Sequence, residues 1–231
     1  MRLSIDVETT GLEQSDRICS VGLLMEDGVH YELIHPAKKI PPAASAIHHI
    51  TNEMVKDSKP FERSDTHALL QTLNAPDNLL ISHNAVFDLG MLEKEGIVWQ
   101  GRVIDTLKCA KALMEDLDGY SLQYLRYELR LYRDEDPFYS GFGINPIPHH
   151  ALSDAILTYR VYTYLLELAD EERLMELSSN RLLLLRMPFG KYAQKRIEEV
   201  AIKDPGYLGW MLDNVLDMDE DLRYSIKHYL R

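Results

Sequence analysis

Residues 2–9 read RLSIDVET. Apolar and β-branched side chains dominate this short run, which predicts a buried β-strand. Asp6 and Glu8 are separated by one residue, so the alternation of side chains along a strand points both carboxylates to one face. Two acids on one face of a buried strand raise each other's pKa unless a cation balances them, and Mg²⁺ or Mn²⁺ prefers such oxygen ligands. Because D-x-E pairs also arise by chance on exposed strands, this pair is only a candidate metal site.

The segments that follow predict a mixed sheet. Two further strands, ICSVGLLME and VHYELIHP, are separated by Asp27-Gly28, a dipeptide typical of tight hairpins. We therefore expect an antiparallel hairpin beside the first strand. Helices and strands then alternate, which indicates an α/β layer fold with a mixed β-sheet flanked by helices. The expected helices cover 43–49, 64–74, 86–95 and 106–114, and the expected strands are NLLISH and RVIDT.

From residue 121 onward the chain is predicted to be mostly helical. The Pro, Gly and Asn content of PFYSGFGINPIPHH, residues 137–150, predicts a loop without regular structure. Gly141 and Gly143 would permit this loop to close over a substrate. A long helix is expected from about 151 to 168.

A last helical unit is expected over residues 191–230, with a break at Asp204-Pro205-Gly206. The helical pattern lapses around 178–190, which suggests a boundary. We therefore predict a larger domain at residues 1–175 and a small C-terminal helical unit at residues 185–231.

Composition indicates an ordered globular protein. The chain has 231 residues, of which 45% are hydrophobic and 27% charged, whereas disordered chains carry fewer apolar groups. Cys19 and Cys109 lie in apolar stretches, which favours buried free thiols in a reducing compartment. No leader sequence and no run of about 18 apolar residues is present, so we expect a cytoplasmic protein with no membrane association.

The formal charge of −12 argues against nucleic-acid binding, because Lys and Arg normally supply much of that affinity. All of the excess lies in residues 1–175, whereas residues 176–231 carry nine basic and nine acidic side chains. Between 181 and 203 six cations face two acids, a local charge of +4. This segment is either a phosphate-binding surface or an ordinary solvated helical face. The six cations are Arg181, Arg186, Lys191, Lys195, Arg196 and Lys203.

Two more acids stand at predicted helix starts, Asp88 in HNAVFD and Asp154 in HHALSDA. Each alone is explained by the favourable interaction of an acid with a helix N-terminus. Together with Asp6 and Glu8, however, they are placed where strand ends and helix starts can aim them into one crevice. Two metal ions held there would grip a phosphodiester, and a histidine could act as the base.

Five motifs, in their order along the chain, resemble the DEDD superfamily of 3′ to 5′ exonucleases: DVETTGL, AIHHIT, HNAVFD, VIDTLK and HHALSDA. The resemblance covers about residues 3–160. It implies a ribonuclease-H-like fold and two Mg²⁺ ions held by four acids, with Mn²⁺ able to substitute. By motif match these catalytic, metal-binding acids are Asp6, Glu8, Asp88 and Asp154.

The superfamily divides by its general base, a histidine five positions before the last acid or a tyrosine four positions before it. His149 and His150 occupy these two places. The resemblance therefore implies the histidine, DnaQ-like branch, with His149 as the catalytic base. His150 lies one helical turn from Asp154 and could substitute, so both histidines stay candidates.

The resemblance also implies substrate contacts. Leu12 lies in a Gly11-Leu12 turn and is exposed unless something rests on it. Phe87 is as readily a core residue as a nucleotide contact. His48 is included although the family often has another residue, such as glycine, at His49. The substrate-binding candidates are Thr9, Leu12, His48, Asn84 and Phe87.

Residues 189–212 and the ending LRYSIKHYLR look like the C-terminal part of the bacterial exodeoxyribonuclease X family. This resemblance implies removal of 5′-mononucleotides from the 3′ ends of DNA, with single strands preferred. Tyr192, Tyr207 and Trp210 lie among cations in this tail. They either bind single strands or form a satellite hydrophobic core.

Other functions remain open at this level. A 3′ to 5′ exoribonuclease could use the same site, because the chemistry does not involve the 2′ position. A non-catalytic nucleic-acid-binding protein could keep the fold without turnover, and a small-molecule phosphodiesterase could keep the metals without acting on oligomers. No protein partner can be predicted from the sequence.

Overall fold

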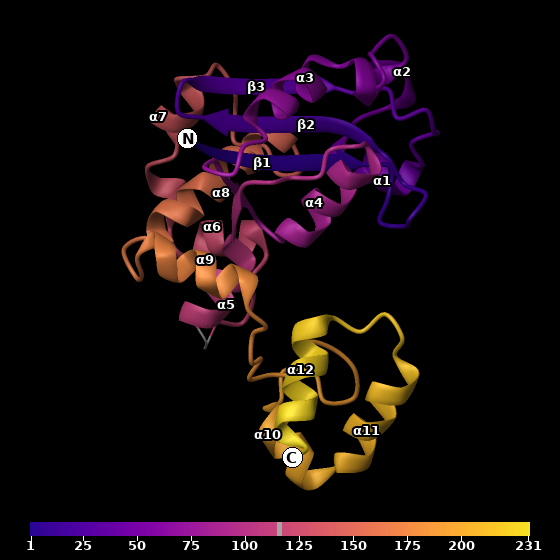
Figure 1. The fold of residues 1–231 in the computed structure, drawn as a ribbon, viewed down its shortest axis with the longest axis vertical. Coiled ribbons are helices and arrows are strands. Elements are labelled where there is room, and N and C mark those ends of the chain that lie inside the picture. Colours follow the sequence, from indigo (N-terminus) through magenta and orange to yellow (C-terminus); the bar gives the residue numbers. More distant parts are fainter. Residues whose placement is uncertain (115–116) are drawn as a thin grey trace.

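A five-stranded mixed sheet forms the centre of the computed structural model, which describes residues 1–114 and 117–231 (Figure 1). The strand order is β3-β2-β1-β4-β5. β1 pairs antiparallel with β2 and parallel with β4, β2 pairs antiparallel with β3, and β5 is parallel to β4. The predicted α/β class and the hairpin beside the first strand are therefore confirmed. The strands are β1 Arg2–Thr9, β2 Ile18–Met25, β3 Gly28–Leu33, β4 Leu79–Ser82 and β5 Arg102–Asp105.

Helices cover both faces of this sheet. They are α1 Pro42–His48, α2 Asn52–Val55, α3 Asp65–Leu73, α4 Ala85–Lys94, α5 Thr106–Leu113, α6 Leu122–Glu128, α7 Asp136–Ser140, α8 Ala151–Leu165 and α9 Glu171–Ser179, with 3-10 turns at Phe61–Arg63 and Leu131–Arg133. On one face, Ile5 of β1 packs with Leu70 of α3 and Leu92 of α4. On the other, Ile81 of β4 packs in one cluster with residues of α5, α6, α8 and α9, among them Val161. The result is a three-layer arrangement with β1 at its centre.

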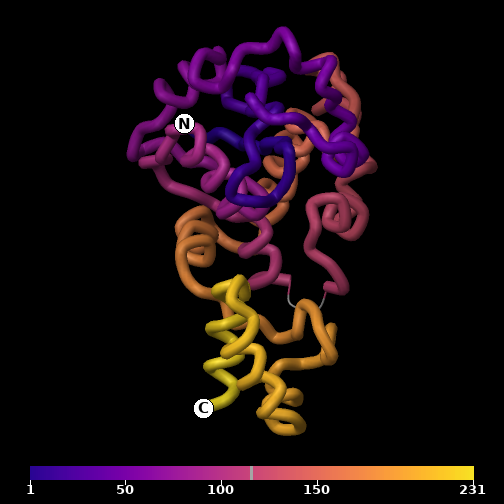
Figure 2. Tube along the Cα trace, turned by 90° about the vertical axis from the view of Figure 1, so that its right-hand side faces the viewer, coloured from indigo at the N-terminus to yellow at the C-terminus, as the bar shows by residue number. Residues whose placement is uncertain are grey.

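The last three helices form a separate lobe below the sheet domain (Figures 1 and 2). These are α10 Ile197–Lys203, α11 Pro205–Asn214 and α12 Glu220–Tyr229, which share a hydrophobic cluster of their own. The chain enters the lobe in an extended conformation, and the backbone N–H of Leu184 donates to Ser225 Oγ at 2.7 Å. The predicted end of the first domain, at residue 175, lies inside α9. Leu177 and Leu182, which follow it, still pack in the hydrophobic core of the sheet domain. The two-unit division otherwise stays a prediction.

Two parts of the chain differ from the predicted elements. Residues 137–150 are predicted to form a loop without regular structure, but residues 137–140 belong to α7. Pro137 stands in the first turn of this helix, where proline is tolerated. The last helical unit begins at Ile197 rather than 191. Gly190 and Gln194 have φ values of +84° and +64°, which no helix accepts, so the preceding residues form turns.

Cys19 and Cys109 are buried free thiols, as expected, and burial raises the pKa of Cys19 to about 12 and that of Cys109 to about 11. Across the described ranges, every helix is too short or too polar to cross a bilayer. The cytoplasmic location stays a prediction.

Candidate active site

β1 presents Asp6 and Glu8 to the face of the sheet that α8 covers. Val7 belongs to the opposite core, and Ser4, on the same face as the two acids, donates to the carbonyl oxygen of Ala155 in α8 at 2.7 Å. The alternation inferred from RLSIDVET therefore holds. Both acids are partly buried at the C-terminal end of the strand.

Gly22 of β2 brings the N-terminus of α8 against this strand. It is paired with Asp6 in the β1–β2 ladder. A Cβ atom on Gly22 would lie 2.1 Å from the backbone nitrogen of Leu152 and 2.2 Å from the carbonyl carbon of Ala151. Only glycine leaves room for this approach, which places the first turn of α8 beside Asp6.

Asp88, in the first turn of α4, is only 2% exposed and bonds directly to β1. Its Oδ1 accepts from the backbone N–H of Val7 at 3.1 Å, and its Oδ2 accepts from Ser82 Oγ at 2.5 Å. Val7 lies between the two acids of β1. These hydrogen bonds fix Asp88 next to the Asp6–Glu8 pair.

Asp154, in the first turn of α8, is held by two donors. Its Oδ2 accepts from the backbone N–H of His149 at 2.8 Å, and its Oδ1 accepts from Gln123 Nε2 at 3.0 Å. The loop that carries His149 is therefore tied to the carboxylate that it precedes.

The four acids repel one another in a poorly solvated space. Burial is the main cause that raises each pKa, and for Asp6 the neighbouring charges of Asp88, Asp154 and Glu8 add to it. The pKa of Asp6 lies well above its usual value, that of Glu8 rises to about 8, that of Asp88 to about 7 and that of Asp154 to about 6. A cluster of carboxylates this unfavourable fits a site whose charge is balanced by divalent cations.

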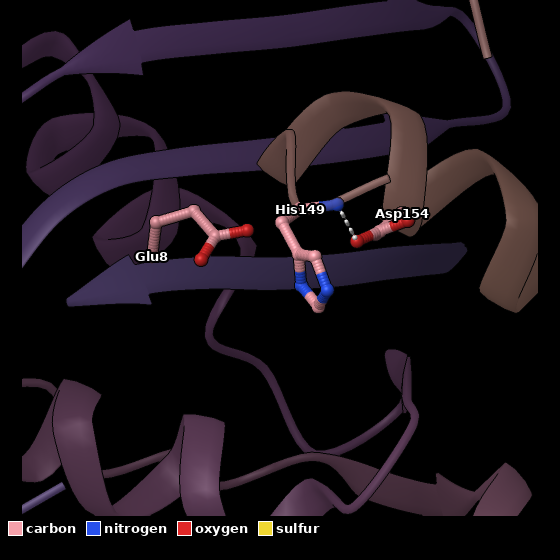
Figure 3. Close-up of side chains that lie close together, drawn as sticks. All are labelled: Glu8, His149 and Asp154. Atoms are coloured by element: carbon pink, nitrogen blue, oxygen red, sulfur yellow. Dashed lines mark hydrogen bonds between the residues drawn. The ribbon is translucent and has the colours of Figure 1, made fainter. Parts of the chain in front are cut away.

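The donor atoms also fit such cations. Ligand atoms of Glu8, His149 and Asp154 all lie within 4.8 Å of one another, and Figure 3 shows the His149 ring between the two carboxylates. Oxygen donors from carboxylates suit Mg²⁺ or Mn²⁺, which bind thiolates poorly. Asp6 and Asp88 lie outside this group of three. The charges of Asp88, Asp154 and Glu8 nevertheless raise the pKa of Asp6, and the charge of Asp88 also raises that of Glu8.

The two histidines have different surroundings. His149 is exposed and has a φ of +57°, a strained conformation for a non-glycine residue, and its ring makes no hydrogen bond among the described residues. His150 caps α8, accepts from the backbone N–H of Ser153 at 3.4 Å, and stacks on Tyr31 at 4.4 Å between ring centroids. The geometry therefore favours His149 as the residue able to exchange a proton with a bound water.

The raised pKa values predict how the stability of the metal-free protein depends on pH. In the unfolded chain these acids titrate near pH 4, whereas Glu8 and Asp88 in the folded chain titrate near 8 and 7. The folded state therefore binds more protons between these values, and stability falls as the pH rises through this window. We expect urea unfolding in chelator to show a loss of more than about 2 kcal/mol from about pH 5 to about pH 8.

Saturating Mg²⁺ in place of the chelator should reduce this loss, because the cation binds the ionised acids of the folded state. A metal-free protein with the same free energy of unfolding at both pH values would show that the pKa values of these acids are not raised in the folded state.

Comparison with known families agrees with this geometry. Residues 3–162 match the model of the exonuclease family, and residues 187–215 match the model of exodeoxyribonuclease X-like C-terminal domains. The chain belongs to the exonuclease family. The resemblance inferred from the five motifs and the tail is thus confirmed, as is the ribonuclease-H-like fold.

Individual relatives cover different shares of the chain. Exodeoxyribonuclease 10 of Escherichia coli K12 is 31% identical over 98% of this chain and 97% of its own length. A PolC-type DNA polymerase III of Thermotoga maritima is also 31% identical, over 75% of this chain but only 12% of that protein. The solved structure of Exonuclease X in complex with 5′ overhanging duplex DNA superimposes with a TM-score of 0.61 and 25% identity, and covers 78% of this chain and all of that chain.

The predicted substrate residues differ in their exposure to solvent. Leu12, which is 84% exposed, and Asn84, which is exposed and has a φ of +72°, are open to solvent. Phe87 is half-buried against the first core, and Thr9 donates to the carbonyl oxygen of Gly11 at 2.7 Å. All of these stay predictions.

His48 is buried, and its predicted contact with the substrate stays a prediction. Its Nδ1 accepts from the backbone N–H of Ile50 at 3.0 Å, and its Nε2 lies 3.2 Å from the carbonyl oxygen of Thr9. These contacts place the His48 ring against the backbone of Thr9, another predicted substrate residue.

Asp105 is a buried residue that the sequence interpretation missed. Its carboxylate accepts from the backbone N–H groups of Asn84 at 3.1 Å and Ala85 at 3.0 Å, and it also caps α5. It therefore holds the strained turn that presents Asn84. An aspartate directly before a helix is a recognisable cap signal, but its second role needs the tertiary structure.

A chain of polar side chains behind Asp154 was also missed. Gln123, which donates to Asp154, lies 3.4 Å through its Oε1 from Arg126 Nη1. Arg126 in turn forms a buried bidentate ion pair with Glu135, one contact of which is 2.8 Å. The residues that lead into α7 thus help to set the orientation of Asp154.

Proposed function

We propose that the protein is a 3′ to 5′ exodeoxyribonuclease that releases 5′-mononucleotides and prefers single-stranded 3′ ends. The observation that carries this proposal is the convergence of four carboxylates and His149 at the end of β1. DNA as substrate is supported by the similarity to exodeoxyribonuclease 10 and by the DNA complex of Exonuclease X.

In the proposed mechanism, Asp6, Glu8, Asp88 and Asp154 would hold two Mg²⁺ ions, for which Mn²⁺ could substitute. When bound, the ions would supply a lower pKa for the attacking water and stabilisation of the leaving oxygen. His149 would act as the general base that accepts a proton from the attacking water. Leu12 and Asn84 position the terminal nucleotide.

The test is a digestion time course with single-stranded DNA labelled at the 5′ or the 3′ end. We expect immediate release of labelled mononucleotide from the 3′ end, a descending ladder from the 5′ label, and no reaction in chelator. Mg²⁺ or Mn²⁺ should restore activity. Release from the 5′ end, or cleavage that persists in chelator, would overturn the proposal.

Two parallel substrates address the rival functions. An RNA oligomer of the same sequence cleaved faster than the DNA would indicate a ribonuclease. Hydrolysis of a chromogenic nucleotide ester without any action on oligomers would indicate a small-molecule phosphodiesterase. Binding of DNA without hydrolysis of any substrate would indicate a non-catalytic protein.

Gln123 provides a prediction about the support of this site. Gln123→Leu removes the donor to Asp154 Oδ1, and loss of a residue that orients a metal ligand typically weakens metal affinity about 10- to 100-fold. We expect the Mg²⁺ concentration for half-maximal activity to rise by this factor. Gln71→Leu, on the exposed surface of α3, is the matched control and should leave it unchanged. An unaltered Mg²⁺ requirement in Gln123→Leu would exclude this positioning role.

A further inference from the structure

The C-terminal lobe carries an aromatic surface that is only partly needed for its core. Tyr192 and Tyr207 meet edge to face at 5.3 Å between ring centroids and pack on the lobe's hydrophobic cluster. Trp210 stacks on Tyr207 at 6.2 Å with an interplanar angle of 22°, yet is 55% exposed. Phe189 is 44% exposed. The inner rings are thus core residues, and the outer rings are open to solvent.

The loop that carries Phe189 is fixed against α11. Gly190 has a φ of +84°, and a Cβ atom there would lie 2.3 Å from the Tyr207 hydroxyl. That hydroxyl accepts from the backbone N–H of Lys191 at 3.1 Å. Lys191 also donates to Asp204, the residue that caps α11, at 2.9 Å. The exposed aromatics therefore stand on a rigid support, which lowers the entropic cost of binding a ligand.

Cations lie next to these aromatics along the chain. Lys195 and Arg196 directly precede α10, and Lys203 ends it. All three are exposed, and none forms an ion pair with any residue of the described ranges. In a chain whose net charge is −12, exposed cations without acidic partners in the described ranges, close in sequence to exposed aromatic rings, complement a phosphate backbone with accessible bases.

We propose that the C-terminal lobe is a second binding site for single-stranded DNA. Bases stack on Trp210 and Phe189, and phosphates contact Lys195, Arg196 and Lys203. The lobe would hold the strand while its 3′ end is in the nuclease site, so that long substrates bind more tightly than short ones. The inference rests on the proposed function in one respect, namely that DNA is the substrate.

Trp210 can report on its own occupancy. The chain has two tryptophans, so Trp99→Phe leaves Trp210 as the sole tryptophan, whose emission can be excited selectively over that of tyrosine. We expect an oligothymidylate of about 20 nucleotides, added in chelator so that it is not cleaved, to quench this fluorescence in a saturable and salt-sensitive manner. Full binding measured by anisotropy without any change in Trp210 emission would overturn the proposal.

Substitutions then test the surface itself. In Phe189→Ala/Trp210→Ala the dissociation constant for the oligomer should rise roughly tenfold or more, since each base stacked on an aromatic contributes on this scale. Leu216→Ala removes another exposed apolar side chain and is the control. Lys195→Gln should reduce the slope of log affinity against log salt by about 0.7, whereas Lys227→Gln on α12 should not. Unchanged affinity and slope would assign this surface to a different partner.

Failure here is distinguishable from failure of the proposed function. Hydrolysis of a chromogenic nucleotide ester reports on the nuclease site alone and should be unchanged in the aromatic double variant. If that variant keeps full affinity for DNA and the wild type still digests DNA, only the second site is excluded. If the wild type neither binds nor digests DNA, the proposed function fails as well.

Discussion

Asp6→Asn is expected to abolish DNA hydrolysis and, at the same time, to stabilise the metal-free protein. Asp6 is surrounded by Asp88, Asp154 and Glu8, and burial and these charges all raise its pKa. Loss of a carboxylate proposed to hold the cations should remove several kcal/mol of transition-state stabilisation, which lowers kcat by roughly a thousandfold or more. Loss of the repulsion should raise the free energy of unfolding in chelator by about 1 kcal/mol or more at pH 8.

Both effects are measurable on one preparation, by digestion of end-labelled DNA and by urea unfolding in chelator. Asp77→Asn is the matched control, because Asp77 is exposed and distant from the cluster in the fold; its stability should change by less than about 0.5 kcal/mol. A metal-free Asp6→Asn protein that is less stable than wild type would mean that the ionised carboxylate makes a favourable contact. The interpretation of these carboxylates as a cluster whose charge divalent cations balance would then be wrong.

The four acids of the site could be predicted from the sequence because each leaves a local signal. Asp6 and Glu8 could be placed on one face because side chains alternate along any strand, and β1 needs nothing else to aim them. Asp88 and Asp154 could be placed because acids at helix starts leave a local signal. In each case the information lies within a few residues of the chain.

Contacts between distant segments could not be predicted in this way. Gly22 had one signal, a glycine inside an apolar strand, but that signal does not say which helix approaches. Gln123 had none, because a glutamine in a helix is ordinary, and its bond to Asp154 joins residues 31 apart. His48 sits in a motif that suggests substrate, whereas its packing against Thr9 and Cys19 is visible only in three dimensions.

His149→Ala is expected to lower kcat by about 10²- to 10⁴-fold, the usual contribution of a general base. The residue has the geometry for this role, since its ring is exposed beside Glu8 and Asp154 and is not used in a structural hydrogen bond among the described residues. His149→Asn should have the same effect while tolerating the positive φ better, which separates loss of the base from strain in the loop.

His150→Ala provides the contrast that assigns the base. It removes a helix cap and a stack on Tyr31, so the free energy of unfolding should fall by about 1–2 kcal/mol while kcat stays close to wild type. The measurement is single-turnover hydrolysis at saturating Mg²⁺, with urea unfolding of the same proteins. If His150→Ala loses the rate and His149→Ala keeps it, the neighbouring histidine is the base. The strained backbone at His149 would then serve only to orient Asp154 through its N–H.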